Sequence, residues 1–304
     1  MKNTRFSNEE YIKYLNESRS SFFWDEDQFK LIFKNIDINA IHNFLDVGCG
    51  LGYLTFIMAR FLNRQCDILG IDNDPKLIKI ANNKMNKSNF SNVSFKVGNI
   101  YNLGLLKNSF DLIAEQLVLS HLDKSEEAVK EMLRVLKPGG FLLLIEPNNL
   151  AMSVVYNNLT NKLSIKEKTA LLSFEMKIQQ GKIKIGEGDD NYGDHILELL
   201  SKHNMKVLDI RLCDKLNPVY PPYNTIKKEQ LIKSIKNENS LYWKRLFKKY
   251  YIAAGGSLKK FNKIWKLKKK MSKQIEKAII NDNYYDTRAG LLYSYLFKKL
   301  DYEQ

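Results

Sequence analysis

The feature that most constrains this chain is a glycine-rich turn between an apolar strand and an apolar helix. The turn lies in the segment FLDVGCGLG at residues 44–52, where Asp46 precedes Gly48, Gly50 and Gly52. Residues 53–62 then have the apolar spacing of a buried helix. Glycines permit a sharp turn and let a ligand approach bare backbone at a helix N-terminus. The segment therefore predicts a pocket for a nucleotide-like ligand.

The spacing of the glycines excludes two common nucleotide sites. Counted from Gly48, the third glycine of a G-x-G-x-x-G dinucleotide motif falls on Tyr53, and no G-x-x-x-x-G-K-[ST] phosphate loop is present. A carboxylate at Asp46 would repel a pyrophosphate but suits a ligand that carries an ammonium or a sulfonium group. S-adenosylmethionine carries both groups and is the cofactor that we predict.

Four further segments follow the turn in order. They are ILGID at 68–72, VSFKVGN at 93–99, FDLI at 110–113 and LKPGGFLLLIE at 136–146. Together with the turn, they resemble the class I S-adenosylmethionine-dependent methyltransferases of the small-molecule type, over roughly residues 43–147. The resemblance implies an α/β fold, a doubly wound and mostly parallel seven-stranded sheet of the Rossmann-like methyltransferase kind, with a helical cap.

The resemblance also implies which residues hold the cofactor. Asp46 is expected near the methionine amino group, and Asp72, 22 residues after Gly50, is expected to accept both ribose hydroxyls. Asn99 replaces the usual aspartate and can still accept from the adenine amino group, without charge assistance. The aspartates alone could instead cap helices. The expected cofactor residues are Asp46, Gly48, Cys49, Gly50, Asp72, Asn73, Asn99, Ile100 and Gln116.

Candidate catalytic residues follow the fourth and fifth strands of the predicted sheet. Methyl transfer is an in-line displacement, so alignment matters most, and a base for the proton of the acceptor is the remaining task. Glu115, His121 and Glu146 are the candidates. His121 lies where many small-molecule members of the family carry a histidine, although an imidazole bonded to backbone is the competing interpretation. No metal-ligand pattern is present.

Composition favours a cytoplasmic enzyme. The three cysteines, Cys49, Cys66 and Cys213, lack disulfide or metal spacing, and Cys49 is expected only to fill the turn. No apolar run approaches the roughly 18 residues of a membrane span. The first residues lack an apolar signal region, so export is not expected.

Positive charge is concentrated at the C-terminal end of the chain. The net charge is +14, and residues 224–304 hold 20 Lys and Arg against 7 Asp and Glu. This block could bind nucleic acid, which would favour an RNA methyltransferase, or it could contact an anionic surface such as that of a membrane. However, Phe261, Ile264, Trp265 and Ile275 recur at helical spacing between the lysines, which favours an ordinary solvated helix. We therefore expect methyl transfer to an oxygen or nitrogen atom of a small molecule. A non-catalytic cofactor-binding protein is the third hypothesis.

The expected domain organisation places one catalytic domain under a helical cap. Residues 1–40 are predicted as a helical cover in which Phe22, Phe23 and Trp24 reach the cofactor mouth. Residues 41–213 form the cofactor-binding core, with a helical insertion at 150–185. Residues 214–283 form a basic helical lid, and 284–304 return to the sheet through a last strand at 290–297.

Overall fold

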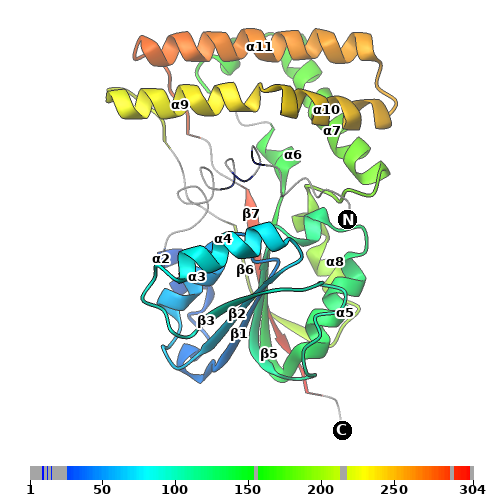
Figure 1. Cartoon of the computed structure of the whole chain (residues 1–304). Coiled ribbons are helices and arrows are strands. Elements are labelled where there is room, and N and C mark those ends of the chain that lie inside the picture. The colour runs from blue at the N-terminus through cyan, green and yellow to red at the C-terminus, as the bar shows by residue number, and fades with distance from the viewer. Residues whose placement is uncertain are drawn as a thin grey trace. The chain divides into compact units, whose positions relative to one another are not determined.

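The computed structural model describes residues 9, 12, 15, 26–153, 157–212, 218–287 and 291–301. These residues divide into two compact units. The sheet unit contains residues 26–148, 191–212 and 291–301, and the helical unit contains residues 149–190 and 218–287 (Figure 1). Residues 22–24, which were expected to cover the cofactor mouth, lie outside the described residues.

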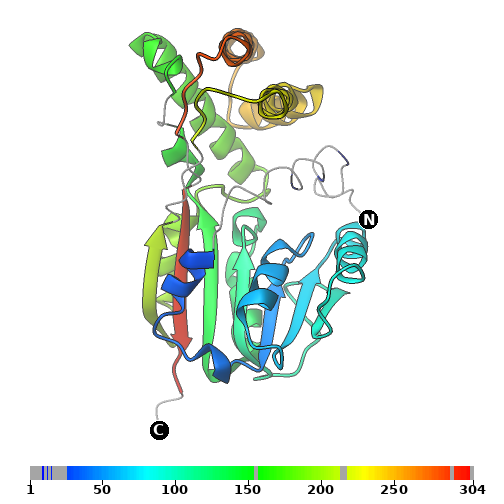
Figure 2. The same ribbon diagram turned by 90° about the vertical axis from the view of Figure 1, so that its left-hand side faces the viewer.

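The sheet unit is built on one seven-stranded sheet in the order β3-β2-β1-β4-β5-β7-β6. Strands β1 to β5 are parallel, whereas β7 runs antiparallel between β5 and β6 (Figure 2). The predicted fold class is therefore confirmed, and the strand predicted at 290–297 is found as β7, antiparallel beside β5. The strands are β1 (Asn43–Val47), β2 (Asp67–Asp72), β3 (Val93–Val97), β4 (Phe110–Gln116), β5 (Leu136–Pro147), β6 (Met205–Leu212) and β7 (Leu292–Lys299).

The central strands are buried on both faces, as a doubly wound sheet requires. Neighbouring residues of β1 point to opposite faces, and both Phe44 and Leu45 are fully buried in separate apolar clusters. The cluster around Phe44 includes helices α2 (Glu26–Ile32), α3 (Tyr53–Phe61) and α4 (Pro75–Met85). The cluster around Leu45 includes α5 (Ser125–Val135) and α8 (Ile196–Leu200).

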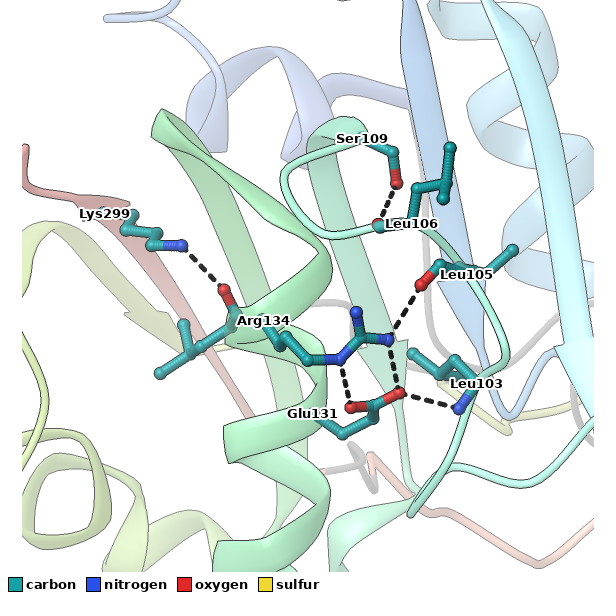
Figure 3. A network of polar contacts seen from close by, with 8 residues as sticks. Leu103, Leu105, Leu106, Ser109, Glu131, Arg134 and Lys299 are labelled. Atoms are coloured by element: carbon teal, nitrogen blue, oxygen red, sulfur yellow. Dashed lines mark hydrogen bonds and ion pairs between the residues drawn. The ribbon is translucent and has the colours of Figure 1, made fainter.

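A polar network fixes helix α5 against the loop that leads from β3 to β4 (Figure 3). Arg134 donates to both carboxylate oxygens of Glu131 and to the carbonyl of Leu105. The Leu103 N–H donates to the same Glu131 carboxylate at 2.8 Å. Because the Glu131 carboxylate binds a bidentate partner as well as backbone, it holds this loop against α5.

The helical unit packs its helices around an aromatic cluster. Its helices are α6 (Asn149–Met152), α7 (Ile165–Lys184), α9 (Thr225–Glu238), α10 (Leu241–Ala253) and α11 (Leu258–Ile280). Phe174 of α7 lies between Tyr251 and Phe261, with ring centroids 5.3 and 5.7 Å away. A Cβ atom on Gly181 would lie 1.8 Å from the Tyr250 carbonyl oxygen, so only glycine lets α7 and α10 approach this closely.

The structure adds detail to two predicted segments. Within residues 26–40, α2 ends at Ile32 and a short 3-10 helix follows at Ile38–Ala40. The α2 residue Phe29 is buried in the core of the sheet unit, and the cover predicted for residues 1–40 stays a prediction. The insertion at 150–185 packs with the basic helices rather than with the core that precedes it. None of the described helices is long and apolar enough to cross a membrane.

Candidate functional site

The glycine turn adopts backbone conformations that favour glycine. Gly48, Gly50 and Gly52 have φ angles of +71°, +52° and +80°. The N–H groups of Gly48 and Cys49 both donate to the Ile71 carbonyl, at 2.7 and 2.9 Å, which ties the turn to the end of β2. Gly52 then begins α3 without a side-chain cap, so the first N–H groups of that helix keep no side-chain partner from the cap position.

Asp72 closes the turn from the neighbouring strand. One carboxylate oxygen accepts from the Gly50 N–H and the other from the Asp74 N–H, each at 2.9 Å. Burial raises the pKa of Asp72, and these two hydrogen bonds act in the opposite direction. Each oxygen has a second lone pair, so the carboxylate can still accept hydroxyl donors while it holds the turn.

Space is open directly above the middle of the turn. A Cβ atom on Gly50 would meet nothing within 4 Å, whereas one on Gly48 would lie 2.4 Å from a methyl group of Val118. Gly48 is therefore required by packing against the loop after β4. Among the described residues, no atom lies within 4 Å of the place where a Cβ of Gly50 would be, which leaves room for a ligand at the bare backbone.

Asp46 is buried and bonded beneath the turn. Its side chain is only 1% exposed, and it accepts a hydrogen bond of 2.5 Å from the Thr55 hydroxyl in the first part of α3. This contact joins β1 to α3 across the turn. The predicted contact of Asp46 with a methionine amino group stays a prediction.

The other predicted cofactor residues at the ends of β2, β3 and β4 differ in their exposure and in their hydrogen bonds. Asn99 is exposed, and its side-chain oxygen accepts from the Tyr101 N–H at 3.0 Å, so a ligand would have to share that oxygen. Asn73 is exposed and Ile100 half-buried. Gln116 is 7% exposed, and its buried Nε2 has no hydrogen-bond partner within the part of the chain that the structure describes. That orphaned donor is a group that a polar ligand could satisfy.

Glu115 and Glu146 form a buried carboxyl pair at the ends of β4 and β5. Both are fully buried, and both accept from the Val118 N–H, at 3.1 and 2.9 Å. The Ser120 N–H also donates to Glu146, at 3.3 Å, and the Ile145 N–H donates to Glu115, also at 3.3 Å. The pair thus holds the loop after β4, in which Leu117 has a φ of +57°.

The pKa values of both carboxyl groups are shifted upwards. Burial, followed by the charge of Glu146 and a hydrogen bond to it, raises the pKa of Glu115 well above its usual range. Burial also raises the pKa of Glu146, while hydrogen bonds from Glu115 and Ser120 act against that rise. We assign a proton to Glu115. This geometry suits a pair that positions the loop, because neither carboxyl group reaches solvent.

His121 lies on the loop that this pair supports. It ends the 3-10 helix Leu119–His121, its N–H donates to the Val118 carbonyl at 2.9 Å, and its side chain is half-buried. Cys49 is buried, and burial together with the charges of Asp46 and Asp72 raises the pKa of its thiol well above the usual value. A neutral thiol is a poor nucleophile, which agrees with Cys49 as a filler of the turn.

Three residues that sequence reasoning missed support the site. Thr55 bonds Asp46, Val118 packs on Gly48, and Lys84 donates to the Leu51 carbonyl at 3.4 Å. The Lys84 ammonium also lies 4.2 Å from the centre of the Tyr53 ring. Thr55 lies nine residues after Asp46, in the first turns of the helix, and that nearness was a usable signal. The other two contacts have no counterpart in local sequence.

Comparison with known proteins agrees with this geometry. A family of methyltransferase domains matches residues 38–283. The ubiquinone/menaquinone biosynthesis C-methyltransferase UbiE of Azotobacter vinelandii is 32% identical over 117 residues, which are 37% of this chain and 46% of that protein. The chain thus spans less than half the length of this relative.

Solved structures share the fold at low sequence identity. The YcgJ protein of Bacillus subtilis has a TM-score of 0.52 and 15% identity, covering 91% of this chain and 100% of that one. Phosphoethanolamine N-methyltransferase 2 of Haemonchus contortus, solved with S-adenosylhomocysteine, has a TM-score of 0.50 and 16% identity, covering 98% and 59%. With its glycine turn, its sheet order and a family match over most of its length, the chain belongs to the class I S-adenosylmethionine-dependent methyltransferases.

Proposed function

We propose that this chain transfers a methyl group from S-adenosylmethionine to a small-molecule acceptor. The observation that carries the proposal is the open backbone at Gly50 beside the Asp72 carboxylate. A carboxylate at the end of β2 suits ribose hydroxyls, and the open turn suits a ligand that lies against main chain. The orphaned Nε2 of Gln116 adds a donor at the end of β4.

The bound cofactor supplies an electrophilic methyl group on its sulfonium. The residues of the chain would bind and orient this cofactor. Asp72 would hold its sugar, and the turn from Gly48 to Gly50 would leave space for it against the main chain. The Glu115–Glu146 pair fixes the loop that carries His121. In this proposal His121 takes the proton of the acceptor, and Glu115 and Glu146 act as positioning residues.

The acceptor class is proposed as oxygen or nitrogen on a small molecule. The name of the Azotobacter relative specifies carbon, and that of the Haemonchus protein specifies nitrogen. An assay panel should therefore include all three acceptor types, together with RNA as the alternative acceptor for a basic chain. Transfer of a labelled methyl group to RNA alone would replace the small-molecule proposal.

Cofactor binding can be tested independently of the acceptor. Calorimetry with S-adenosylhomocysteine should show binding, and Asp72→Ala should weaken it at least tenfold, because about 1.4 kcal/mol is lost with the ribose contacts. Asp67→Ala, an exposed acid at the other end of the same strand, is the matched control and should leave the affinity unchanged. Equal affinities in both variants would refute the ribose assignment.

The open space above the turn gives a second matched pair. Gly50 and Gly139 both have positive φ angles, and a Cβ on either would meet no protein atom within 4 Å. Gly50→Ala should reduce affinity for S-adenosylhomocysteine, because its methyl group occupies the ligand's space. Gly139→Ala should share only the backbone strain of roughly 1 kcal/mol. Should both variants bind normally, the ligand does not lie over the turn.

A third variant tests the role of His121. His121→Ala should leave the affinity for S-adenosylhomocysteine intact. It should reduce turnover by roughly 100-fold or more, which is the contribution typical of a general base. Turnover that survives this substitution would show that His121 is not the base.

A further inference from the structure

Helix α11 carries a continuous line of lysines along one face. The line consists of exposed side chains, and we call it the lysine ridge: Lys259, Lys263, Lys266, Lys270, Lys273 and Lys277. Their separations alternate between four and three residues, so they follow one face of the helix. At a rise of about 1.5 Å per residue, the ridge extends roughly 27 Å.

The ridge faces away from the core of its own unit. The buried residues of α11 include Phe261, Trp265 and Ile279, which lie about half a turn around the helix from the ridge. These residues pack towards α7, α9 and α10, and Figures 1 and 2 agree that α11 runs alongside α9 and α10. The ridge therefore makes no contribution to the apolar packing of the helical unit.

Acidic residues do not neutralise the ridge. Within the described residues, none of its lysines forms an ion pair, and Lys270 has only an electrostatic interaction with Glu167. Helix α11 contains one acid, Glu276, and its ion-paired lysine, Lys268, reaches Glu175 from the packed side. Like charges three and four residues apart destabilise a helix, so stability of the free protein does not account for this arrangement.

The shape and chemistry of the ridge identify the kind of partner. A straight ridge can touch a flat anionic surface along its whole length, whereas the backbone of a duplex curves away from it. A single strand would need aromatic side chains for base stacking, but the aromatic residues of α11, Phe261 and Trp265, are buried. Lysine ammonium groups act as point charges and suit a diffuse anionic surface. Leu258 and Ile280, at the two ends of α11, are 46% and 59% exposed.

We propose that the lysine ridge of α11 docks the protein on an anionic phospholipid bilayer. Clustered lysines on a helix are attracted to anionic headgroups, and the attraction adds up for each lysine near the surface. Of the two exposed aliphatic residues, Ile280 lies three residues after Lys277, near the ridge, and can enter the interface. Docking of this kind needs no membrane-spanning helix and is independent of the proposed methyl transfer.

Vesicle binding tests the proposal with the full chain. The probe is a phosphatidylcholine vesicle with about one third phosphatidylglycerol, compared with pure phosphatidylcholine, in a flotation assay at low salt. The wild type should bind the anionic vesicles at least tenfold more tightly, and about 0.5 M salt should abolish the difference. The variant Lys263→Gln/Lys266→Gln/Lys270→Gln should bind them roughly 100-fold more weakly than the wild type.

Two control variants separate the ridge from net charge. Lys34→Gln/Lys87→Gln/Lys107→Gln removes the same charge from exposed positions of the sheet unit and should bind within about threefold of the wild type. Arginine at the three ridge positions keeps the charge and should restore binding. Calorimetry with S-adenosylhomocysteine and helix content by circular dichroism confirm that each variant is folded.

Three results would overturn the proposal. One is equal affinity for neutral and anionic vesicles, and another is equal loss in the ridge and sheet-unit variants. The third is a ridge-dependent affinity for duplex RNA that exceeds the affinity for anionic vesicles, because the partner would then be a nucleic acid.

Discussion

Helix α5 of the sheet unit and helix α11 of the helical unit both carry basic side chains on their surfaces. They differ in whether these side chains form ion pairs with acidic residues of the same helix. In α5, Lys130 pairs with Glu126 at 2.8 Å and Arg134 pairs with Glu131 at 2.7 Å. Along the exposed ridge of α11, lysine follows lysine instead. Pairs of opposite charge three or four residues apart stabilise a helix, whereas like pairs destabilise it. The comparison separates a helix arranged for stability from one that presents charge.

Buried charge differs between the units as well. The sheet unit buries two carboxyl groups, Glu115 and Glu146, whose pKa values are raised by burial and which hold a loop beside the glycine turn. The helical unit buries the cation Lys182, 1% exposed, against Asp190. The first pair serves the candidate cofactor site, and the second joins elements of the helical unit. The predictions below test whether the two units respond separately.

The largest expected effect is the loss of the buried cation in the helical unit. Lys182→Ala leaves Asp190 without its buried partner, so the free energy of unfolding should fall by about 3–5 kcal/mol, measured by urea denaturation. Lys184→Ala, an exposed neighbour on the same helix, should change it by less than about 0.5 kcal/mol. The affinity for S-adenosylhomocysteine should be unaltered in both variants. A weakened affinity in Lys182→Ala would show that the helical unit supports the cofactor site.

The next effect concerns glycine in the two units. Gly48→Ala places a Cβ against Val118 at positive φ and should cost roughly 2–5 kcal/mol, with at least tenfold weaker binding of S-adenosylhomocysteine. Gly255→Ala in the helical unit has equally positive φ but meets no atom within 4 Å. It should cost only about 1–2 kcal/mol and leave binding unchanged. Equal losses of stability and of affinity in the two variants would contradict the special role of Gly48 in the sheet unit.

A pH-dependent effect should follow from the carboxyl pair. The raised pKa of Glu115 means that the folded protein holds a proton that the unfolded chain releases above its ordinary pKa. The contribution of Glu115 to stability is therefore complete below that ordinary pKa and is lost as pH rises towards the folded pKa, by about 1.4 kcal/mol per pH unit. Glu115→Gln imitates the protonated form and should remove this slope. Parallel curves for the wild type and the variant, from denaturation between acid and mildly alkaline pH, would contradict the raised pKa of Glu115.

The smallest effects should have opposite signs in the two helices. Lys266→Gln removes two repulsive pairs in the ridge, those of Lys266 with Lys263 and with Lys270. It should therefore raise the free energy of unfolding by about 0.4–1 kcal/mol at low salt. Lys130→Gln removes a pairing with Glu126 in α5 and should lower it by about 0.3–0.5 kcal/mol. Both changes should disappear at high salt. A stabilising effect of Lys130→Gln, or a destabilising effect of Lys266→Gln, would break the comparison between the helices.

The glycine turn and the neighbouring Asp72 carboxylate could be recognised from the sequence. Asp72 was predicted as a cofactor residue at the end of the second strand, 22 residues after Gly50, and the structure joins the two residues by a hydrogen bond. The apolar runs and the resemblance of the five ordered segments predicted the sheet, and the alternating residues at 290–297 predicted its last strand. Such features could be predicted because strands, turns and helix starts depend on residues close together in the chain.

The surroundings of polar groups could not be predicted in the same way. Glu115 and Glu146 look like candidates for a pocket because each follows an apolar strand. Their carboxyl groups are instead covered by the loop at 117–121, which folds back between the strands. The Asn99 side-chain oxygen accepts from the Tyr101 N–H two residues later, a contact that the sequence did not indicate, and its predicted contact with adenine stays a prediction. Both outcomes depend on which donors the fold brings near.

The sequence by itself determined the class of fold, the cofactor turn, its partner acid and the excess of lysine at the C-terminal end. Only the tertiary structure decided that burial raises the pKa of Glu115, that the insertion at 150–185 joins the basic helices, and that the lysines of the ridge form no ion pair with any of the described residues. The reason is physical: backbone conformation follows from neighbouring residues, whereas burial, pKa shifts and charge pairing depend on groups that meet only when distant segments pack together.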